Sequence, residues 1–306
     1  MEFKVINKNE DIRIILIKDN QEVAKATCYF KGTPKVNGEN IGCIGDLEIK
    51  SVEFGNIILK KCEEILKEKN LKFIVAPMNR NTWNKYRTLK YTNGDSIFLL
   101  ENVNSIEYNK ILLDSGYKEL YTYTSNKGLI EDAYTSETLE YAEKNLEQEN
   151  ITIRKFKKGN YLEDLKKIYN ISKISFSKNP LYTEIDEKSF LKQYEKYIEM
   201  VDDELILIAE KDEKEIGFVF CIPDYNEPKE GKKLETLILK TIAVLPEYQE
   251  LAIGNILLNK ISQIAKKKGF KKWIFAFMYS NNTSQKMAKR NKAQIMREYA
   301  IYGKEI

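Results

Sequence analysis

The stretch from Val244 to Asn255 constrains the fold of this 306-residue chain more than any other segment. An apolar run, Leu237–Val244, stops at Pro246, as a β-strand would, because proline cannot donate to a strand ladder. A segment of helical periodicity follows and ends in three lysines and a glycine, which suit the negative end of a helix dipole. Between them lies a Gln-x-x-Ala-x-Gly loop at 249–254, whose small residues and free helix-start N–H groups suit a pyrophosphate.

This order of strand, proline, loop and capped helix resembles motif A of the GNAT (Gcn5-related N-acetyltransferase) superfamily, whose loop reads Arg/Gln-x-x-Gly-x-Gly/Ala. Ala252 stands here where the family has its first glycine. The alternative is an ordinary strand-loop-helix corner, and the context around the motif argues against it. The likeness continues over the second half, with helices expected at Tyr161–Ser175 and Glu187–Met200 and a closing strand at Ile295–Gly303.

An internal repeat links the two halves of the chain. With an offset of 199 positions, the segment Gly55–Lys61 aligns with Gly254–Lys260, and the match continues without gaps to Val75 over Ile274. The first half is therefore predicted to be a diverged copy; chance similarity between two amphipathic helices is the alternative. In this copy Glu53 replaces Ala252, and a carboxylate there would repel a pyrophosphate, so no nucleotide-like cofactor is expected in the first half.

The predicted fold class is α/β (α+β by some schemes), with two tandem GNAT-like domains that each hold a mixed, mostly antiparallel twisted sheet flanked by helices. The chain resembles the tandem GNAT proteins of bacteria, with a degenerate first copy. The expected boundaries are 1–130 for the degenerate domain, 131–150 for a helical connector and 151–306 for the GNAT domain with the acetyl-CoA site. A further strand is expected at Ile97–Leu100.

The resemblance also implies which residues hold acetyl-CoA. In GNAT enzymes the strand before the loop splays from its neighbour, so its backbone would pair with the pantetheine arm like an added strand. The Val244 N–H would then face the thioester oxygen as an oxyanion donor. The residues assigned to the cofactor in this way are Ile242, Ala243, Val244, Gln249, Glu250, Leu251, Ala252, Ile253, Gly254, Asn255, Asn282 and Ser284.

The usual acid and base of the family have no clear counterparts. Lys289 occupies the position of the family's tyrosine acid; it could stabilise a departing thiolate or lie on the surface. The loss is tolerable, because a thiol with a pKa of about 8.5 leaves with little help. The strand positions that often carry a base hold Lys240 and Ile238, so no residue is assigned as the general base. A water chain or Tyr86 remains an alternative for this role.

Two segments are expected to meet the acceptor. Lys240 is a charge inside an apolar strand, which suggests either an anionic acceptor or an exposed strand edge. The segment 77–87 is rich in aromatic, amide and guanidinium groups, and tandem GNAT proteins show a similar one; a capped surface helix is the alternative. The predicted acceptor cleft is lined by Trp83, Tyr86, Arg87, Tyr182 and Lys240. Two cations there imply a carboxylate or phosphate on the acceptor.

Composition narrows the remaining functions. The chain has no histidine and its four cysteines are scattered, so they are expected to be buried free thiols, and no metal site is expected. A net charge of +4 is too small to imply nucleic acid, and no signal peptide or membrane span is evident, so a cytoplasmic protein is expected. We expect a monomer or homodimer that binds a small-molecule amine.

The leading functional hypothesis is an acetyl-CoA-dependent N-acyltransferase that acts on the amine of a small, anionic acceptor by direct attack on the thioester. One alternative is an acyl-CoA-binding sensor without turnover, which the missing acid and base would favour. Another is a Fem-like aminoacyl transferase, which would need a strongly basic face for charged tRNA. The identity of the acceptor, the acyl chain and the oligomeric state do not follow from the sequence.

Overall fold

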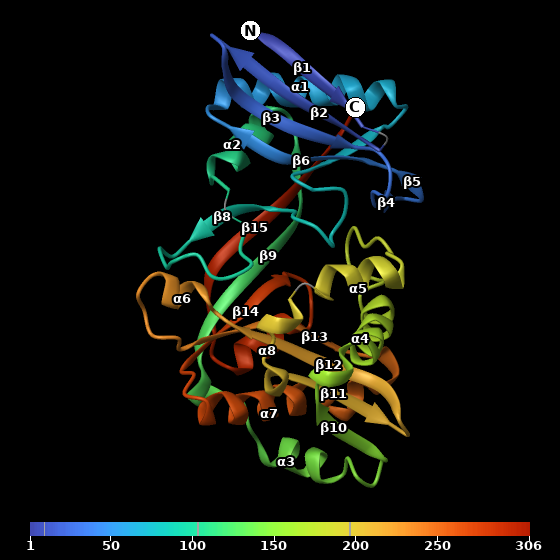
Figure 1. Cartoon of the computed structure of the whole chain (residues 1–306), viewed down its shortest axis with the longest axis vertical. Helices are drawn as coiled ribbons and strands as arrows, with labels where there is room; N and C mark the ends of the chain where they lie inside the picture. The colour runs from blue at the N-terminus through green and yellow to red at the C-terminus, as the bar shows by residue number, and fades with distance from the viewer. Residues whose placement is uncertain (9, 103, 196) are drawn as a thin grey trace.

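The computed structural model describes residues 1–8, 10–102, 104–195 and 197–306. Two halves follow each other along the long axis, and both chain termini lie in the first half (Figure 1). The strands are β1 Glu2–Asn7, β2 Asp11–Lys18, β3 Gln21–Tyr29, β4 Lys35–Val36, β5 Glu39–Asn40, β6 Gly42–Ile49, β7 Phe73–Ala76, β8 Thr88–Thr92, β9 Lys118–Leu129, β10 Ile151–Lys155, β11 Ile206–Lys211, β12 Lys214–Pro223, β13 Thr236–Val244, β14 Lys272–Tyr279 and β15 Gln294–Glu305. The α-helices are α1 Val52–Glu68, α2 Glu107–Asp114, α3 Glu137–Lys144, α4 Tyr161–Ser175, α5 Glu187–Glu195, α6 Asn226–Lys229, α7 Ile253–Lys267 and α8 Ser284–Arg290.

One mixed sheet runs through the whole molecule. Thirteen strands of the described chain form it, in the order β1-β2-β3-β6-β7-β15-β9-β14-β13-β12-β11-β10, with β8 paired to β15. The last strand of each half crosses into the other half: β15 pairs with β7 through Tyr302↔Ala76, and β9 pairs with β14 through Leu129↔Lys272. The boundaries at 1–130, 131–150 and 151–306 stay a prediction, and the crossing strands join the two halves into one sheet.

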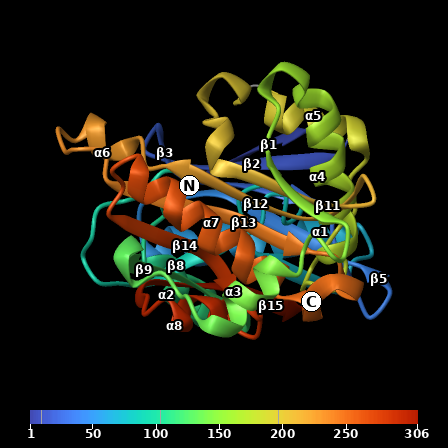
Figure 2. The same cartoon turned by 90° about the horizontal axis from the view of Figure 1, so that it is seen from below.

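Helices cover both faces of this sheet in the second half. Seen from below, α4 and α5 lie on one side of the strands and α7 lies on the other (Figure 2). The α7 side buries aliphatic residues of β11, β12 and β13, and the α4 side buries the aromatic residues Phe190 and Phe218. The site described below lies where β13 and β14 end, between these two layers.

The local structure follows the sequence patterns in most places. The hairpin turns at Asp19–Asn20 and Asp212–Glu213 have positive φ at both residues, as a type I′ hairpin requires. All four cysteines are free and buried, as expected. The predicted helix Glu187–Met200 is shorter: α5 ends at Glu195, a 3₁₀ turn covers Ile198–Met200, and residue 196 lies outside the described residues. None of the described helices is both long and apolar enough to cross a membrane.

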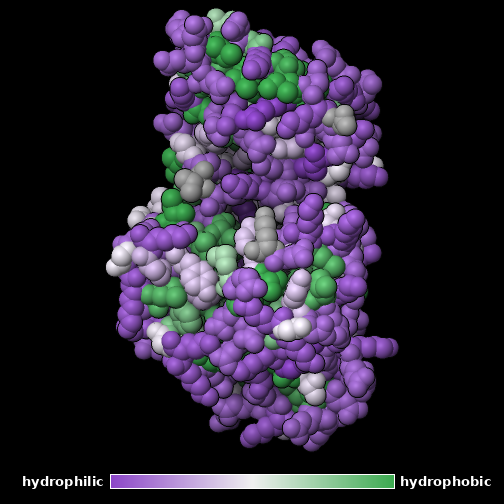
Figure 3. Space-filling view, viewed as in Figure 1, coloured by the Kyte–Doolittle hydropathy of each residue, from purple (hydrophilic) through white to green (hydrophobic). Residues whose placement is uncertain are grey.

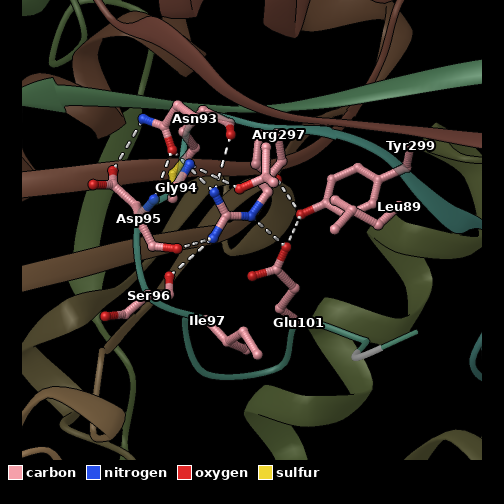
Figure 4. Close-up of polar contacts among 12 residues, drawn as sticks. Leu89, Asn93, Gly94, Asp95, Ser96, Ile97, Glu101, Arg297 and Tyr299 are labelled. Carbon is pink, nitrogen blue, oxygen red and sulfur yellow. Dashed lines mark hydrogen bonds and ion pairs between the residues drawn. The ribbon is translucent and has the colours of Figure 1, made fainter. Parts of the chain in front are cut away.

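The strand expected at Ile97–Leu100 is wrong. The strand of this region is β8, and residues 97–100 form a loop whose Phe98 is buried against Phe277. The loop replaces the strand because it wraps around the buried guanidinium of Arg297 in β15, which needs acceptors (Figure 4). The acceptors are Glu101 Oε1 at 3.0 Å, Asn93 Oδ1 at 3.1 Å, and the carbonyls of Met296, Asp95 and Ser96 at 3.1, 2.6 and 3.0 Å.

Candidate active site

The strands β13 and β14 separate halfway along their length. They pair in parallel from Thr236↔Lys272 to Leu239↔Phe275, and the described structure has no further pair between them. Both strands are irregular at this level. Lys240 is the extra residue of a bulge against β12, and Phe277 of β14 has a left-handed φ of 55° at a register shift against β9. A bulge bends its strand, so the two irregularities together open the sheet at this point.

The open edge of β13 presents the backbone of Val244. The Leu245 N–H donates to Ile216 O of β12 at 2.8 Å, and hydrogen-bonding direction alternates along an antiparallel strand. The N–H and C=O of Val244 therefore face away from β12, toward the opening. The carbonyl accepts from Gln249 Nε2 at 3.3 Å and Ser175 Oγ at 3.4 Å. The N–H points into the same opening, where an oxyanion or an extended ligand could bind it.

The loop of the Gln-x-x-Ala-x-Gly motif leads directly into α7. Residues Pro246–Leu251 form a 3₁₀ turn, and Ala252 precedes α7 with φ 57° and no side-chain cap. The first N–H groups of α7 therefore have no side-chain acceptor from the cap residue. A Cβ at Gly254 would meet Met287 at 3.5 Å and Val244 at 3.8 Å, which is ordinary contact. This glycine keeps space open rather than relieving a clash.

The left-handed Ala252 supports a stability prediction. A residue with a Cβ pays about 1 kcal/mol or more in this conformation, and glycine does not. We expect Ala252→Gly to raise the free energy of unfolding by roughly 1 kcal/mol in urea denaturation. Ala265→Gly, inside α7, should lower it instead, because glycine costs about 1 kcal/mol in a helix interior and Ala265 is fully buried. A loss of stability in Ala252→Gly would contradict the left-handed geometry.

Helix α8 forms the other wall of the opening. The Ser284 hydroxyl is buried and has no hydrogen-bond partner within the described structure. Asn282 Oδ1 accepts only from the Thr283 hydroxyl at 3.2 Å, and Met287 lies over Gly254. A polar ligand arm between α7 and α8 would satisfy the orphaned Ser284 hydroxyl. Lys289 is exposed on this helix, and its side chain has no hydrogen bond or ion pair to the described residues.

The equivalent opening of the first half is filled by the chain itself. β6 and β7 are also parallel and pair only from Gly42↔Ile74 to Cys43↔Val75. Past that point Met78 N donates to Ile44 O at 2.8 Å, and Asn79 Oδ1 accepts from Asp46 N at 2.8 Å. A Cβ at Gly45, the counterpart of Val244, would lie 2.3 Å from Asn79 Oδ1. The backbone that is open in β13 is thus occupied in β6.

The N-terminus of α1, the corresponding helix of the first half, is blocked as well. Ser51 caps α1 by accepting from Phe54 N, and a Cβ at Gly55 would lie 2.6 Å from Ile111 of α2. Gly55 is the counterpart of Gly254, where the nearest contact is 3.5 Å. The space between α1 and α2 is therefore tighter than the space between α7 and α8. The N-terminus of α1 also already has a hydrogen-bond acceptor, Ser51.

Lys240 lies on the α4–α5 side of the sheet. Its Nζ donates to Tyr194 OH at 3.1 Å and lies over the rings of Tyr194 and Phe220. No carboxylate pairs with it among the described residues. Tyr194 and Phe220 were not predicted from the sequence; Tyr194 lies in a predicted helix, but no pattern shows that an aromatic ring will face a lysine 46 positions away.

Trp83 joins this aromatic group from the first half. Its ring lies 5.7 Å from Phe190 and 6.2 Å from Tyr182, and its Nε1 donates to Thr183 O at 2.7 Å. Phe190 in turn lies 4.7 Å from Tyr194, which holds Lys240. Three of the five predicted acceptor residues, Trp83, Tyr182 and Lys240, are thus connected through one aromatic cluster.

Tyr86 and Arg87 contact a second group of aromatic rings. The Arg87 guanidinium donates to Phe277 O at 3.4 Å and lies between four rings, those of Tyr86, Tyr123, Phe277 and Tyr299. Both residues line a separate cavity in the first half. Arg87 therefore contacts β14 at the residue where that strand bends, and the structure records no contact between Arg87 and Lys240.

Residues 165–292 match the model of the acetyltransferase (GNAT) family. A search of curated protein sequences finds no match.

Several solved structures share the fold. One is a GCN5-related glucosamine N-acetyltransferase region of a fungal multi-domain GH3 β-N-acetylglucosaminidase (11% identity, TM-score 0.59), over 96% of this chain and 33% of that one, so the chain spans about a third of its length. A GCN5-related N-acetyltransferase from Sphaerobacter thermophilus is similar at 12% identity and a TM-score of 0.56, over 97% of this chain and 80% of that one. A tandem GNAT protein from the clavulanic acid biosynthesis pathway is similar at 8% identity and a TM-score of 0.56, over 96% of this chain and 82% of that one. At such identities the likeness shows the fold alone, and it confirms the predicted fold class.

Proposed function

Because residues 165–292 match the acetyltransferase (GNAT) family, we propose that this chain is an N-acyltransferase that uses acetyl-CoA and acylates the amine of a small, anionic acceptor. The observation that carries the proposal is the opening between β13 and β14, with the open backbone of Val244 on one side and the uncapped start of α7 at its end. The first half has the same elements with both features closed. One acyl-CoA site per chain follows from this difference.

Each part of the opening has a distinct proposed role. The thioester of acetyl-CoA supplies the activated acyl group. Val244, with Ile242 and Ala243, would bind the pantetheine arm through its backbone, and its N–H would stabilise negative charge on the thioester oxygen. Residues 249–255 would bind the pyrophosphate at the start of α7. Asn282 and Ser284 would bind the arm from the side of α8.

The acid and base are the less complete part of the site. Burial raises the pKa of Tyr299 and of Tyr123, so neither phenol can act as a base near neutral pH. Tyr86 and Lys289 stay proposed, as base and acid respectively. Because a thiolate is a good leaving group, the protein's main task is to orient an unprotonated amine and to stabilise charge on the thioester oxygen.

The acceptor is proposed to approach from the side of Lys240. This ammonium lies at the bulge next to the opening and has rings and a phenol around it instead of a carboxylate. An anionic group on the acceptor would complete its coordination, and Trp83 and Tyr182 would form the apolar wall. Lys240→Met keeps the length of the side chain while it removes the charge.

A turnover assay tests the proposal. Acetyl-CoA is incubated with amino acids and phosphorylated amines, and the release of free CoA is followed. We expect release with an anionic amine, and we expect Lys240→Met to raise its KM by roughly tenfold or more, since a charged hydrogen bond contributes about 1.5–3 kcal/mol. Lys188→Met, an exposed lysine of α5, is the control. Tight binding of acetyl-CoA without release for any amine would instead support a sensor.

A further inference from the structure

A second polar cavity lies in the first half of the molecule. Its volume is about 440 Å³, which is within the range of small-molecule sites. It is bounded by β2, β3, the end of β6, the segment 77–87, and the residues Asn102, Asn104 and Tyr108. On the face shown in Figure 3 the surface is hollowed between the two halves, and most of the surrounding surface is hydrophilic. The cavity shares no lining residue with the opening between β13 and β14.

The charges around this cavity are unbalanced. Four cationic side chains and two carboxylates line it: Arg13, Lys25, Lys85 and Arg87, with Asp46 and Glu48. Lys25 is paired with Glu48. Asp46 accepts hydrogen bonds from the Tyr29 hydroxyl and from Asn79 Nδ2. Arg13, Lys85 and Arg87 have no carboxylate partner within the described structure, and they outnumber Asp46, which has neutral donors only, so the net charge of the wall is positive.

The wall is held in place by its own hydrogen bonds. Asn102 donates to Tyr86 O at 3.3 Å and Asn104 donates to Arg87 O at 3.2 Å. On the opposite side Tyr108 donates to Leu47 O at 3.1 Å and accepts from Ile49 N at 3.2 Å. The neutral polar groups thus serve to fix the backbone. The three unpaired cations are the groups left to bind a ligand, in a site that needs little reorganisation.

Arg87 is the most constrained of the three. Its φ of 67° is left-handed, a conformation that costs a side-chain-bearing residue about 1–2 kcal/mol. Arg87 N donates to Pro77 O at 2.9 Å, and Asn104 holds its carbonyl, so both ends of the residue are fixed. Its guanidinium has one hydrogen bond, of 3.4 Å, and therefore has donors to spare. Strained residues that the surroundings hold in place are concentrated at binding sites.

We propose that this cavity binds a small molecule with phosphate or carboxylate groups, at a site separate from the acyl-CoA opening. Arg87 would bind the anion with its planar donor pair, together with Lys85 from the same segment and Arg13 from β2. Arg87 also donates to Phe277 O, at the bend of β14, so it would connect the ligand to the strand that forms one side of the opening. The proposal concerns binding alone and does not depend on acyl transfer.

Calorimetric titration of the full chain with pyrophosphate, and separately with citrate, tests the proposal. We expect one site for at least one probe. Arg13→Gln together with Lys85→Gln should raise its Kd by about a hundredfold or more, since two charged hydrogen bonds are lost and each contributes about tenfold or more. Neither side chain has a partner to lose among the described residues. Lys4→Gln with Lys35→Gln removes the same charge from exposed positions of the first half and should leave the Kd unchanged.

Each further outcome has a defined meaning. Binding of pyrophosphate only, or of citrate only, supports the site and identifies its anion as phosphate or carboxylate. Loss of binding in Gly254→Asp, but not in the cavity variant, would place the anion at the α7 loop and overturn the proposal. No binding of either probe to the wild-type protein, or equal weakening in the cavity and control pairs, would overturn it as well. Acetyl-CoA affinity in the cavity variant should be unchanged, so this result does not depend on the proposed function.

Discussion

Gly254→Asp is expected to abolish acetyl-CoA binding and leave the fold intact. A side chain at this position meets only Met287 and the side chains of β13, at 3.5 Å or more, so it needs no backbone shift. The new carboxylate would lie in the first turn of α7, beside the proposed pyrophosphate. Two unit charges 4 Å apart repel by about 4 kcal/mol near a protein surface, so a loss of at least a hundredfold in affinity is expected. Calorimetry should give one site per wild-type chain.

Gly254→Ala is the matched control for this variant. It adds the same Cβ without the charge, and the contacts found for that atom are of ordinary length. Its affinity should stay within a few-fold of the wild-type value. Two equivalent sites in the wild-type protein would mean that Asn79 and Ser51 do not close the first half. Unchanged affinity in Gly254→Asp would mean that the cofactor does not bind at the start of α7.

Arg297→Met is expected to cause the largest loss of stability. Arg297 is 2% exposed, and its hydrogen bonds hold the loop 93–101 against β15 (Figure 4). Without it, Glu101, whose side chain is 3% exposed, would keep a buried charge, and among the described residues only Tyr299 OH would donate to it. Removal of one partner of a buried ion pair costs roughly 3–5 kcal/mol, which chemical denaturation would measure.

Lys127→Met provides the comparison for Arg297→Met. Lys127 pairs with Asp95 of the same loop at 2.9 Å, but both side chains are 34% exposed. Solvent screens such a pair, so the change should cost about 1 kcal/mol or less. If the two variants lost the same stability, the burial of Arg297 and Glu101 would not be the reason for the effect.

The cofactor loop shows how much local sequence can predict. An apolar run, a proline and a helical period are properties of neighbouring residues, so strand, loop and helix appear in the structure as β13, the 3₁₀ turn and α7 within a residue or two. The repeat predicted that α1 would follow the same pattern, and both helices do follow a strand that pairs in parallel with the next one. Glu53 led to the prediction that the first half holds no cofactor, and the structure adds further reasons to expect this, in Asn79, Ser51 and Ile111.

The strand that was predicted at Ile97–Leu100, and that the structure lacks, shows where local patterns mislead. An apolar run has the same appearance in a strand and in a buried loop, because burial, not hydrogen bonding, selects apolar residues. The loop form depends on Arg297, which lies almost 200 positions later in the chain. No local signal connects the two. The same holds for Lys240, whose aromatic partners come from α5's end and from β12.

The sequence by itself determined the fold class, the order of most elements and the strand-loop-helix corner around residues 237–267, because these depend on periodicity and on residues close together in the chain. The tertiary structure decided how the halves join, through exchange of β9 and β15 between them. It also placed Arg87 beside a cavity with Arg13 and Lys85. Such placements depend on contacts between residues far apart in sequence. These contacts stabilise the protein only when the sheet has brought the residues together, so local sequence patterns do not reveal them.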